Sequence, residues 1–259
     1  MFRRLSAYTV SGVSPLGVLH SKLLLQVGRH SGRFILGSAN MTGAGLAGNL
    51  EIVGEVRTDA QSDGEKRLVA AAYRYLQRVS DSNKQSVQTQ FDWMLSRAPW
   101  LLNTEPANGI ERLADGSKAA LLTTGGQKGV GRQFVEAIGN DHIESLIVVS
   151  PYWDPQLEAL GYLSEALGNP ELSILIDKKT EQFPGDALSR FQNARVYDRS
   201  NFQEGRFIHA KLIIAQSVEH DHLLFGSTNC TVLVRRSVTL NLRARMRRQV
   251  CIASCLREA

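Results

Sequence analysis

The chain contains one short polar pattern twice, with the same spacing in both copies. The first copy is His20-Ser21-Lys22 followed by Gly37-Ser38-Ala39-Asn40, and the second is His209-Ala210-Lys211 followed by Gly226-Ser227-Thr228-Asn229. The interval between matched positions is identical from the histidines to the asparagines. A repeat of rare polar residues at fixed spacing is far more specific than either copy alone. It predicts two equivalent segments that bring two histidines, two lysines and two asparagines to one shared site, a combination that suits a phosphate.

Apolar strands surround the paired polar residues. Residues 19–27 and 206–216 are predicted strands, and each carries its histidine and lysine on one face, because side chains at i and i+2 point the same way. A turn and a second strand follow in both copies, over residues 33–36 and 222–226. Each copy therefore predicts a β-hairpin.

Helices are predicted between further strands, which favours an α/β fold. Ser62 and Glu65 form a capping box that opens a helix to about Val79. Beyond residue 118, strands are predicted near residues 119–122, 146–149, 172–176 and 195–197, with helices near 131–139 and 156–167.

The repeat divides the chain into two halves. The first half covers residues 1–95, a linker rich in proline and glycine covers residues 96–118, and the second half covers residues 119–231. The segment before His20 is much shorter than the part of the second half that precedes His209, so the first half is expected to be incomplete at its N-terminus. Residues 232–259 form a basic, atypical tail.

The net charge of +5 does not describe the body of the protein. Residues 232–259 carry seven arginines and one acidic residue, a net +6, so the other residues together carry +5 less +6, or −1. The three cysteines all lie at position 230 or later, which argues against a disulfide framework or a zinc site. The arginine-rich tail has two open interpretations, an unstructured segment or a nonspecific nucleic-acid contact.

No apolar run approaches the ~18 residues that a membrane-spanning helix needs. The start of the chain, residues 1–9, has the charges of a signal peptide but no apolar stretch after them. We therefore expect a soluble, cytoplasmic protein without stable membrane insertion.

The paired residues have the chemistry for phosphodiester cleavage. An imidazole with one free nitrogen attacks phosphorus to give a phosphohistidine, and a second, protonated imidazole donates a proton to the departing oxygen. Lys22, Lys211, Asn40 and Asn229 are expected to bind the non-bridging oxygens. No metal and no cofactor is expected.

These residues resemble the phospholipase D superfamily, whose signature is H-x-K followed by G-S-x-N, usually twice in one active site. The resemblance covers residues 20–51 and about 119–231. It implies two pseudo-symmetric α/β halves, each a mixed sheet flanked by helices, with the site at their interface. It also implies the residue roles. His20 and His209 are the nucleophile and the acid–base pair, Lys22, Lys211, Asn40 and Asn229 are phosphate ligands, and Ser38 and Ser227 support the substrate site.

Glu51 completes the first motif of the resemblance. In the superfamily an N-x-E often follows the motif, and its carboxylate orients a catalytic imidazole; Asn49-Leu50-Glu51 matches it. No equivalent follows Thr231, and Val27 and Gln216 stand where the superfamily has aspartate. The change in composition after Thr231 resembles a shifted reading frame or a truncation. With the short N-terminus, it predicts a fragment of a larger enzyme.

The leading hypothesis is a metal-independent phosphodiesterase that forms a phosphohistidine and acts on nucleic acid as a nuclease. One alternative is a phospholipase or phosphatidyl transferase acting on lipid, and another is an inactive remnant that binds DNA or a partner. The sequence leaves open the substrate, the oligomeric state and which histidine is the nucleophile.

Weaker signals have ordinary explanations. Trp93, Trp100 and Trp153 suit base stacking, although packing is the default interpretation. His220 and His222 suit a metal, but a solvated hairpin loop is the preferred interpretation.

Overall fold

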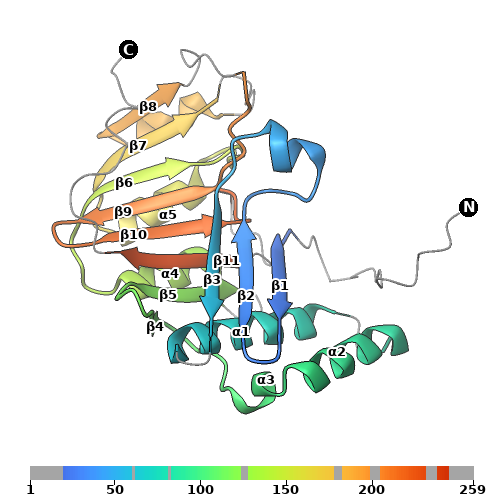
Figure 1. Ribbon diagram of the computed structural model, residues 1–259. Helices are drawn as coiled ribbons and strands as arrows, with labels where there is room; N and C mark the ends of the chain where they lie inside the picture. Colours follow the sequence, from blue (N-terminus) through green and yellow to red (C-terminus); the bar gives the residue numbers. More distant parts are fainter. Residues whose placement is uncertain are drawn as a thin grey trace, which may run out of the picture.

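The computed structural model describes residues 20–59, 62–80, 83–123, 128–177, 183–198 and 205–231, together with the backbone of residues 238–244. These residues form two β-sheets flanked by helices, which confirms the predicted α/β class (Figure 1).

The smaller sheet belongs to the first half and has the order β1-β2-β3, antiparallel throughout. Its strands are β1 (Leu23–Val27), β2 (Gly32–Gly37) and β3 (Val53–Thr58). Three helices follow it: α1 (Asp63–Val79), α2 (Gln85–Arg97) and α3 (Trp100–Asn103). The apolar stripe of α1, which includes Leu68, Ala72 and Tyr75, packs against Phe34 and Leu36 of β2 in one core.

The larger sheet has eight strands in the order β4-β5-β11-β10-β9-β6-β7-β8. They are β4 (Glu111–Arg112), β5 (Lys118–Thr123), β6 (Ile143–Val149), β7 (Glu171–Ile176), β8 (Ala194–Asp198), β9 (Leu212–Ser217), β10 (Asp221–Gly226) and β11 (Val238–Ala244). The pairs β6–β7 and β7–β8 are parallel and the other pairs are antiparallel. The larger sheet is therefore mixed, whereas the smaller one is not.

The core of the second half lies between the larger sheet and α4 (Val130–Ile138) and α5 (Glu158–Ala166). Two shorter helical segments complete the described elements, the π-helix η2 (Ala44–Gly48) and the 3-10 helix η3 (Gly185–Arg190). In Figure 1 the strands of the smaller sheet cross in front of those of the larger sheet.

The two motifs occupy matching places in the two sheets. The hairpins β1–β2 and β9–β10 are related by the same interval that separates the two motifs in the sequence, since β2 and β10 correspond residue for residue. Both copies close in the same way, because the amide of Gly37 donates to the carbonyl of Lys22 at 3.3 Å and the amide of Gly226 donates to that of Lys211 at 3.4 Å. The locked spacing in the sequence reflects this shared hairpin.

The halves meet through both side chains and backbone. Phe225 of β10 is buried in the core of the first half. It lies so close to Gly54 of β3 that a Cβ at position 54 would be 2.3 Å from its ring. The segment before β9 is tied to the first half as well, because Leu50 donates its amide to the Phe207 carbonyl at 2.8 Å and accepts the His209 amide at 3.0 Å.

Two segments contain more structure than the sequence indicated. The predicted linker holds α3 and β4, and the predicted atypical tail contributes β11, which lies between β10 and β5 in the larger sheet. Residues 238–244 alternate apolar and polar residues, which is typical of a strand, but the arginine bias around them hides this pattern. The rest of the tail, with Cys251 and Cys255, lies outside the described residues.

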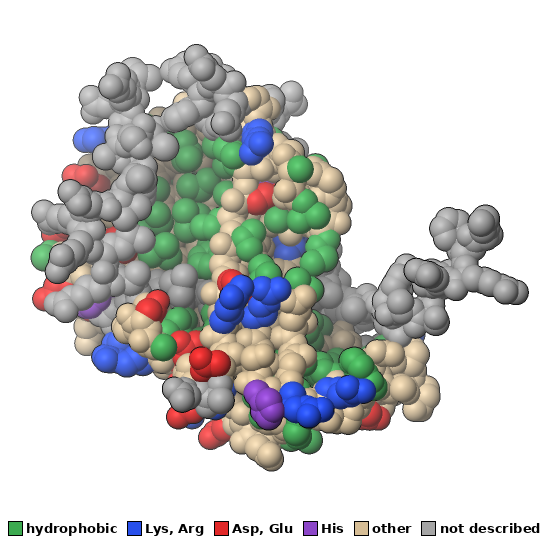
Figure 2. All heavy atoms as spheres, in the orientation of Figure 1, with side chains coloured by type: hydrophobic (Ala, Val, Ile, Leu, Met, Phe, Trp, Pro, Cys, Tyr) green, Lys and Arg blue, Asp and Glu red, His purple; other side chains and the backbone are tan. Residues whose placement is uncertain are grey.

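The charges on the visible face are dispersed. Figure 2 shows lysine and arginine side chains in several separate groups with acidic side chains between them, and no continuous basic stripe on that face. Among the described residues, no helix is both long and apolar enough to span a bilayer.

Candidate active site

The histidine and lysine of each motif lie just before the first strand of its hairpin. Regular strand begins at Leu23 in one copy and at Leu212 in the other, directly after the lysine. In both copies the lysine Nζ donates to the carbonyl of its own histidine, at 3.0 Å for Lys22 and 2.8 Å for Lys211. The shared contact holds each ammonium at the backbone of its own histidine, and Lys211 Nζ also contacts the His209 ring.

Glu51 from the first half holds His209 from the second. His209 Nδ1 donates to Glu51 Oε1 at 2.7 Å, and both side chains are at most 10% exposed. The other carboxylate oxygen, Oε2, accepts a hydrogen bond from Ser38 Oγ, and Ser38 Oγ in turn accepts the Ile52 amide at 3.0 Å. Ser38 is fully buried. This series of hydrogen bonds fixes the orientation of the carboxylate, and the carboxylate fixes the orientation of the imidazole.

His20 is held by the opposite copy too, but by a carbonyl. Its Nδ1 donates to the backbone oxygen of Ser227 at 2.9 Å. Because a carbonyl only accepts, Nδ1 carries the proton and the neutral ring presents an unprotonated Nε2. Ser227 is 1% exposed, so the acceptor is rigidly placed. Each histidine is therefore tied at Nδ1 by the other motif, with unlike partners.

Burial lowers the pKa of every cationic group in this cluster. Desolvation is the main cause of the lowered pKa of His20, and Lys22 and Lys211 add to it while the bond to Ser227 opposes it. Desolvation also dominates the lowered pKa of His209, with the Lys211 charge, against an opposing contribution from Glu51. Both imidazoles therefore favour the neutral form near neutral pH.

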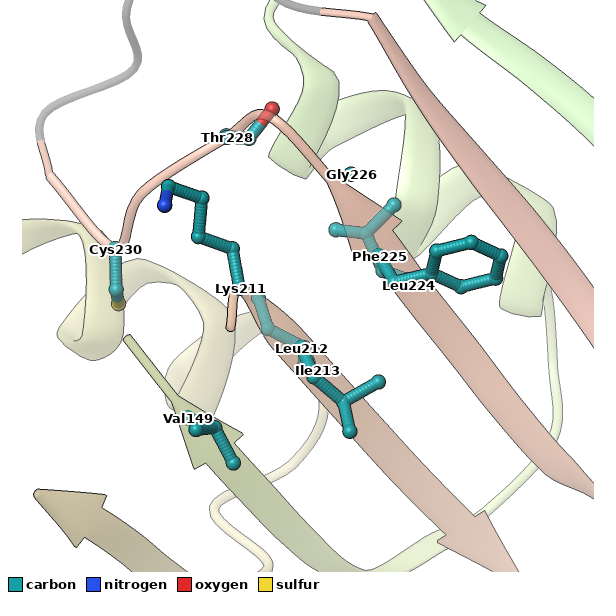
Figure 3. A pocket seen from close by; sticks show the side chains of 9 residues that line it. All are labelled: Val149, Lys211, Leu212, Ile213, Leu224, Phe225, Gly226, Thr228 and Cys230. Carbon is teal, nitrogen blue, oxygen red and sulfur yellow. The ribbon is translucent and has the colours of Figure 1, made fainter. Parts of the chain in front are cut away.

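Lys211 is the most strongly perturbed of these groups. Burial lowers its pKa to about 7, although the negative charge of Glu51 raises it. Its Nζ lies 3.2 Å from Nε2 of His209. Figure 3 shows its side chain beside the turn that carries Thr228 and Cys230. These residues line a void of about 10 Å³, which has room for about one water molecule. Lys22 also has a pKa lowered by burial.

The two asparagines have fewer contacts with the site than the histidines and lysines. Asn40 is exposed, and its side-chain amide makes no hydrogen bond to either of the two described imidazoles. It begins the loop that leads to η2, where Gly45 is required because a Cβ there would lie 2.2 Å from the Asn40 carbonyl oxygen. Asn229 lines a cavity of about 250 Å³ that also touches α5, and its Oδ1 is buried with no hydrogen-bond partner among the described residues. Their predicted role as phosphate ligands stays a prediction.

Sequence reasoning missed three aromatic neighbours of the motifs. Tyr75 of α1 shares a short hydrogen bond with Ser21 Oγ, between His20 and Lys22 in the chain. Tyr152 and Phe207 lie on the second half, with ring centroids 6.2 Å and 6.1 Å from that of His209. The position of Tyr152, just after a buried strand, was the only available signal.

The histidines of the β9–β10 hairpin do not form a solvated loop. His222 is fully buried, and its Nε2 lies 2.9 Å from Asp141 Oδ2, with His220 Nδ1 3.5 Å from the same oxygen. Across the part of the chain that is described, no three His, Cys, Asp or Glu side chains are grouped as a metal ion would require.

Comparisons with known proteins find structural neighbours only. No family model matches the sequence, and no curated protein matches it. Polyphosphate kinase from Porphyromonas gingivalis aligns with 89% of this chain at 12% identity and a TM-score of 0.49, and the chain spans 33% of that protein's length.

Two further structures align with about half of the chain. NucT from Helicobacter pylori aligns with 50% of it and has 86% of its own length covered, at 15% identity and a TM-score of 0.35. A mutant of yeast tyrosyl-DNA phosphodiesterase aligns with 48% of it and has 32% covered, at 13% identity and a TM-score of 0.28. In its paired motifs, and in the way both meet at one site, the chain resembles the phospholipase D superfamily.

Proposed function

We propose that this chain is a phosphodiesterase of the phospholipase D superfamily, and that it hydrolyses its substrate through a phosphohistidine. The observation that carries the proposal is the crossed arrangement of the two imidazoles. Each has Nδ1 tied to the opposite motif, and the charges of Lys22, Lys211 and His209 all act on His20, which supports one region shared by both imidazoles, the buried ammonium of Lys211 and the partly buried one of Lys22. An anion in that region gains two cations and meets both reactive nitrogens.

His20 is the proposed nucleophile and His209 the proposed acid–base group. The carbonyl partner of His20 keeps its Nε2 unprotonated, and none of the described residues hydrogen-bonds that nitrogen. His209 instead has the Glu51 carboxylate at Nδ1, which stabilises the imidazolium when Nε2 takes up a proton, and the Lys211 ammonium 3.2 Å from Nε2, which promotes release of that proton.

The reaction then has two displacements at phosphorus. His20 Nε2 forms the N–P bond as the bond to the leaving oxygen breaks, and His209 gives its Nε2 proton to that oxygen. Water next attacks phosphorus, His209 takes a proton from it, and the N–P bond breaks. Lys22 and Lys211 neutralise the non-bridging oxygens in both steps, so the proposed reaction needs no metal.

Nucleic acid is the proposed substrate, ahead of lipid. Tyr152 places a 43% exposed aromatic ring beside His209, and such a ring suits a nucleobase next to the scissile phosphate. Cleavage of single-stranded DNA or RNA in the presence of EDTA, without choline release from phosphatidylcholine liposomes, is the expected result. Choline release without nucleic-acid cleavage would favour the lipid alternative.

Trapping distinguishes the roles of the two histidines. With bis(4-nitrophenyl) phosphate the leaving group needs no protonation, so His209→Asn is expected to form the phosphohistidine and stall before its hydrolysis. Mass spectrometry should then find the phosphoryl adduct on His20, and His20→Asn should give no adduct. A folded wild-type chain that cleaves neither substrate, with DNA binding unchanged in both variants, would support the inactive-remnant alternative.

A further inference from the structure

We infer that Tyr152 and Phe207 form a stacking platform for the base next to the scissile phosphate, so that the site selects single-stranded nucleic acid. This inference rests on the proposed phosphodiesterase function and adds the part of the substrate that the site recognises. Both aromatic rings lie near His209, with centroids 6.2 Å and 6.1 Å from that of the imidazole and interplanar angles of 82° and 40°.

Tyr152 is exposed although its surroundings are rigid. It follows the carboxyl end of β6, and the residues on both sides of it, Pro151 and Trp153, are buried. Ser150 Oγ donates to the Tyr152 carbonyl at 2.8 Å and accepts the Cys230 amide at 3.0 Å, which ties this loop to the second motif. The ring is nevertheless 43% exposed. A large aromatic side chain held in water by a fixed backbone is a pre-organised contact surface.

Phe207 is fixed from three directions. Its carbonyl accepts the Leu50 amide at 2.8 Å, the next amide, that of Ile208, donates to Asp177 Oδ2 at 3.1 Å, and His209 donates its own amide to Leu50 at 3.0 Å. Asp177 follows the carboxyl end of β7, so both aromatic residues depend on neighbouring parallel strands. Crevices at the carboxyl ends of parallel strands are common ligand sites in α/β proteins.

The position of the platform determines which chemical group it contacts. A phosphate bound at His209 brings its own ester substituents within reach of the rings. In nucleic acid the nearest planar substituent is a base, and base stacking on an aromatic side chain tolerates any sequence. A base in a duplex is already stacked and paired, so unpaired strands make this contact at lower cost.

The test uses short oligonucleotides with a single cleavable phosphodiester, in which the other linkages are methylphosphonates. One substrate has bases on both sides of the linkage, and the other has stable abasic residues there. The wild-type chain is expected to cleave the first with a kcat/KM higher by about fivefold to a hundredfold, the range that stacking of one base provides.

Variants assign that preference to the platform. Tyr152→Ala should bring the ratio of the two substrates close to one, Tyr152→Phe should keep it, and Phe207→Leu should reduce it. Trp93→Ala is the matched control, because Trp93 is a 59% exposed aromatic residue on α2. A ratio that is unchanged in Tyr152→Ala, or a wild-type ratio near one, overturns the inference.

A second readout separates this inference from the proposed function. An oligonucleotide with 2-aminopurine beside the linkage should lose fluorescence on binding to the His20→Ala variant, because stacking quenches the probe, and should lose less when Tyr152→Ala is added. Quenching without any wild-type cleavage would refute the proposed function and retain the platform. Cleavage without Tyr152-dependent quenching would refute the platform and retain the proposed function.

Discussion

Replacing the buried ammonium of Lys211 should change how stability depends on pH. Lys211 is 2% exposed, and burial lowers its pKa from 10.5 to about 7. Between these two values the unfolded chain binds a proton that the folded chain does not. The free energy of unfolding therefore rises with pH over this window, and the cost of burying Lys211 reaches its full size as the pH falls below its folded pKa.

The size of the effect follows from the two pKa values. Burying Lys211 costs about 4 kcal/mol of folding free energy at pH 7 and about 2 kcal/mol at pH 9, with about 1.4 kcal/mol for each pKa unit. The wild-type chain should therefore gain about 2 kcal/mol between these pH values from this residue. Lys211→Met keeps the length of the side chain and lacks the charge, so its gain should be smaller by that amount.

Urea unfolding followed by circular dichroism at pH 7 and pH 9 measures both gains. Lys84→Met, which removes an exposed ammonium on the N-terminal side of α2, is the matched control and should behave like the wild type. At pH 7 Lys211→Met should also have a higher free energy of unfolding than the wild type, because it does not bury a charge. The lost hydrogen bond to the His209 carbonyl reduces this advantage by about 1 kcal/mol. Equal gains in the wild type and Lys211→Met would refute the reasoning from burial.

Three further predictions concern the site and the interface. Glu51→Gln should lower kcat by about 100-fold or more, because His209 loses the group that orients it, while Lys84→Met should not; steady-state kinetics measure this. In the same Glu51→Gln variant the basic limb of the kcat/KM pH profile should move to lower pH, because the Glu51 carboxylate raises the pKa of His209, which must be protonated to act as the acid in the first displacement; an unmoved limb would argue against His209 as the titrating group. Gly54→Ala should destabilise the fold by about 1–3 kcal/mol in urea unfolding, because its Cβ meets the Phe225 ring, and the double variant Gly54→Ala, Phe225→Leu should recover part of the loss.

The sequence predicted the features that depend on local pattern and on the repeat. The constant interval between the two motifs anticipates matching hairpins, because the same hydrogen bond closes each one. The helix that begins after Ser62 forms where the apolar stripe indicates, but the predicted capping box does not, because the Ser62 side chain makes no cap and Glu65 accepts the Ala114 amide at 2.7 Å instead. The Glu51 carboxylate contacts the His209 imidazole, which its predicted orienting role requires. The role itself stays a prediction.

The sequence did not predict features that depend on tertiary contacts. Nothing local indicates that Glu51 pairs with the histidine of the other copy, far away along the chain. Trp153 packs against Phe183, as the default interpretation of the three tryptophans expected, but nothing in the sequence singled out its exposed neighbour Tyr152. His222 is buried for the same kind of reason, since its partner Asp141 comes from a distant loop.

The crossed ties at Nδ1 have a consequence for when the chain can act. Because Ser227 aligns His20 and Glu51 aligns His209, neither imidazole is correctly aimed until the two hairpins have docked. Any opening of the seam around Gly54 and Phe225 releases both rings together. The proposed chemistry is thereby confined to the fully assembled molecule, and in a partly folded chain neither half is expected to cleave on its own.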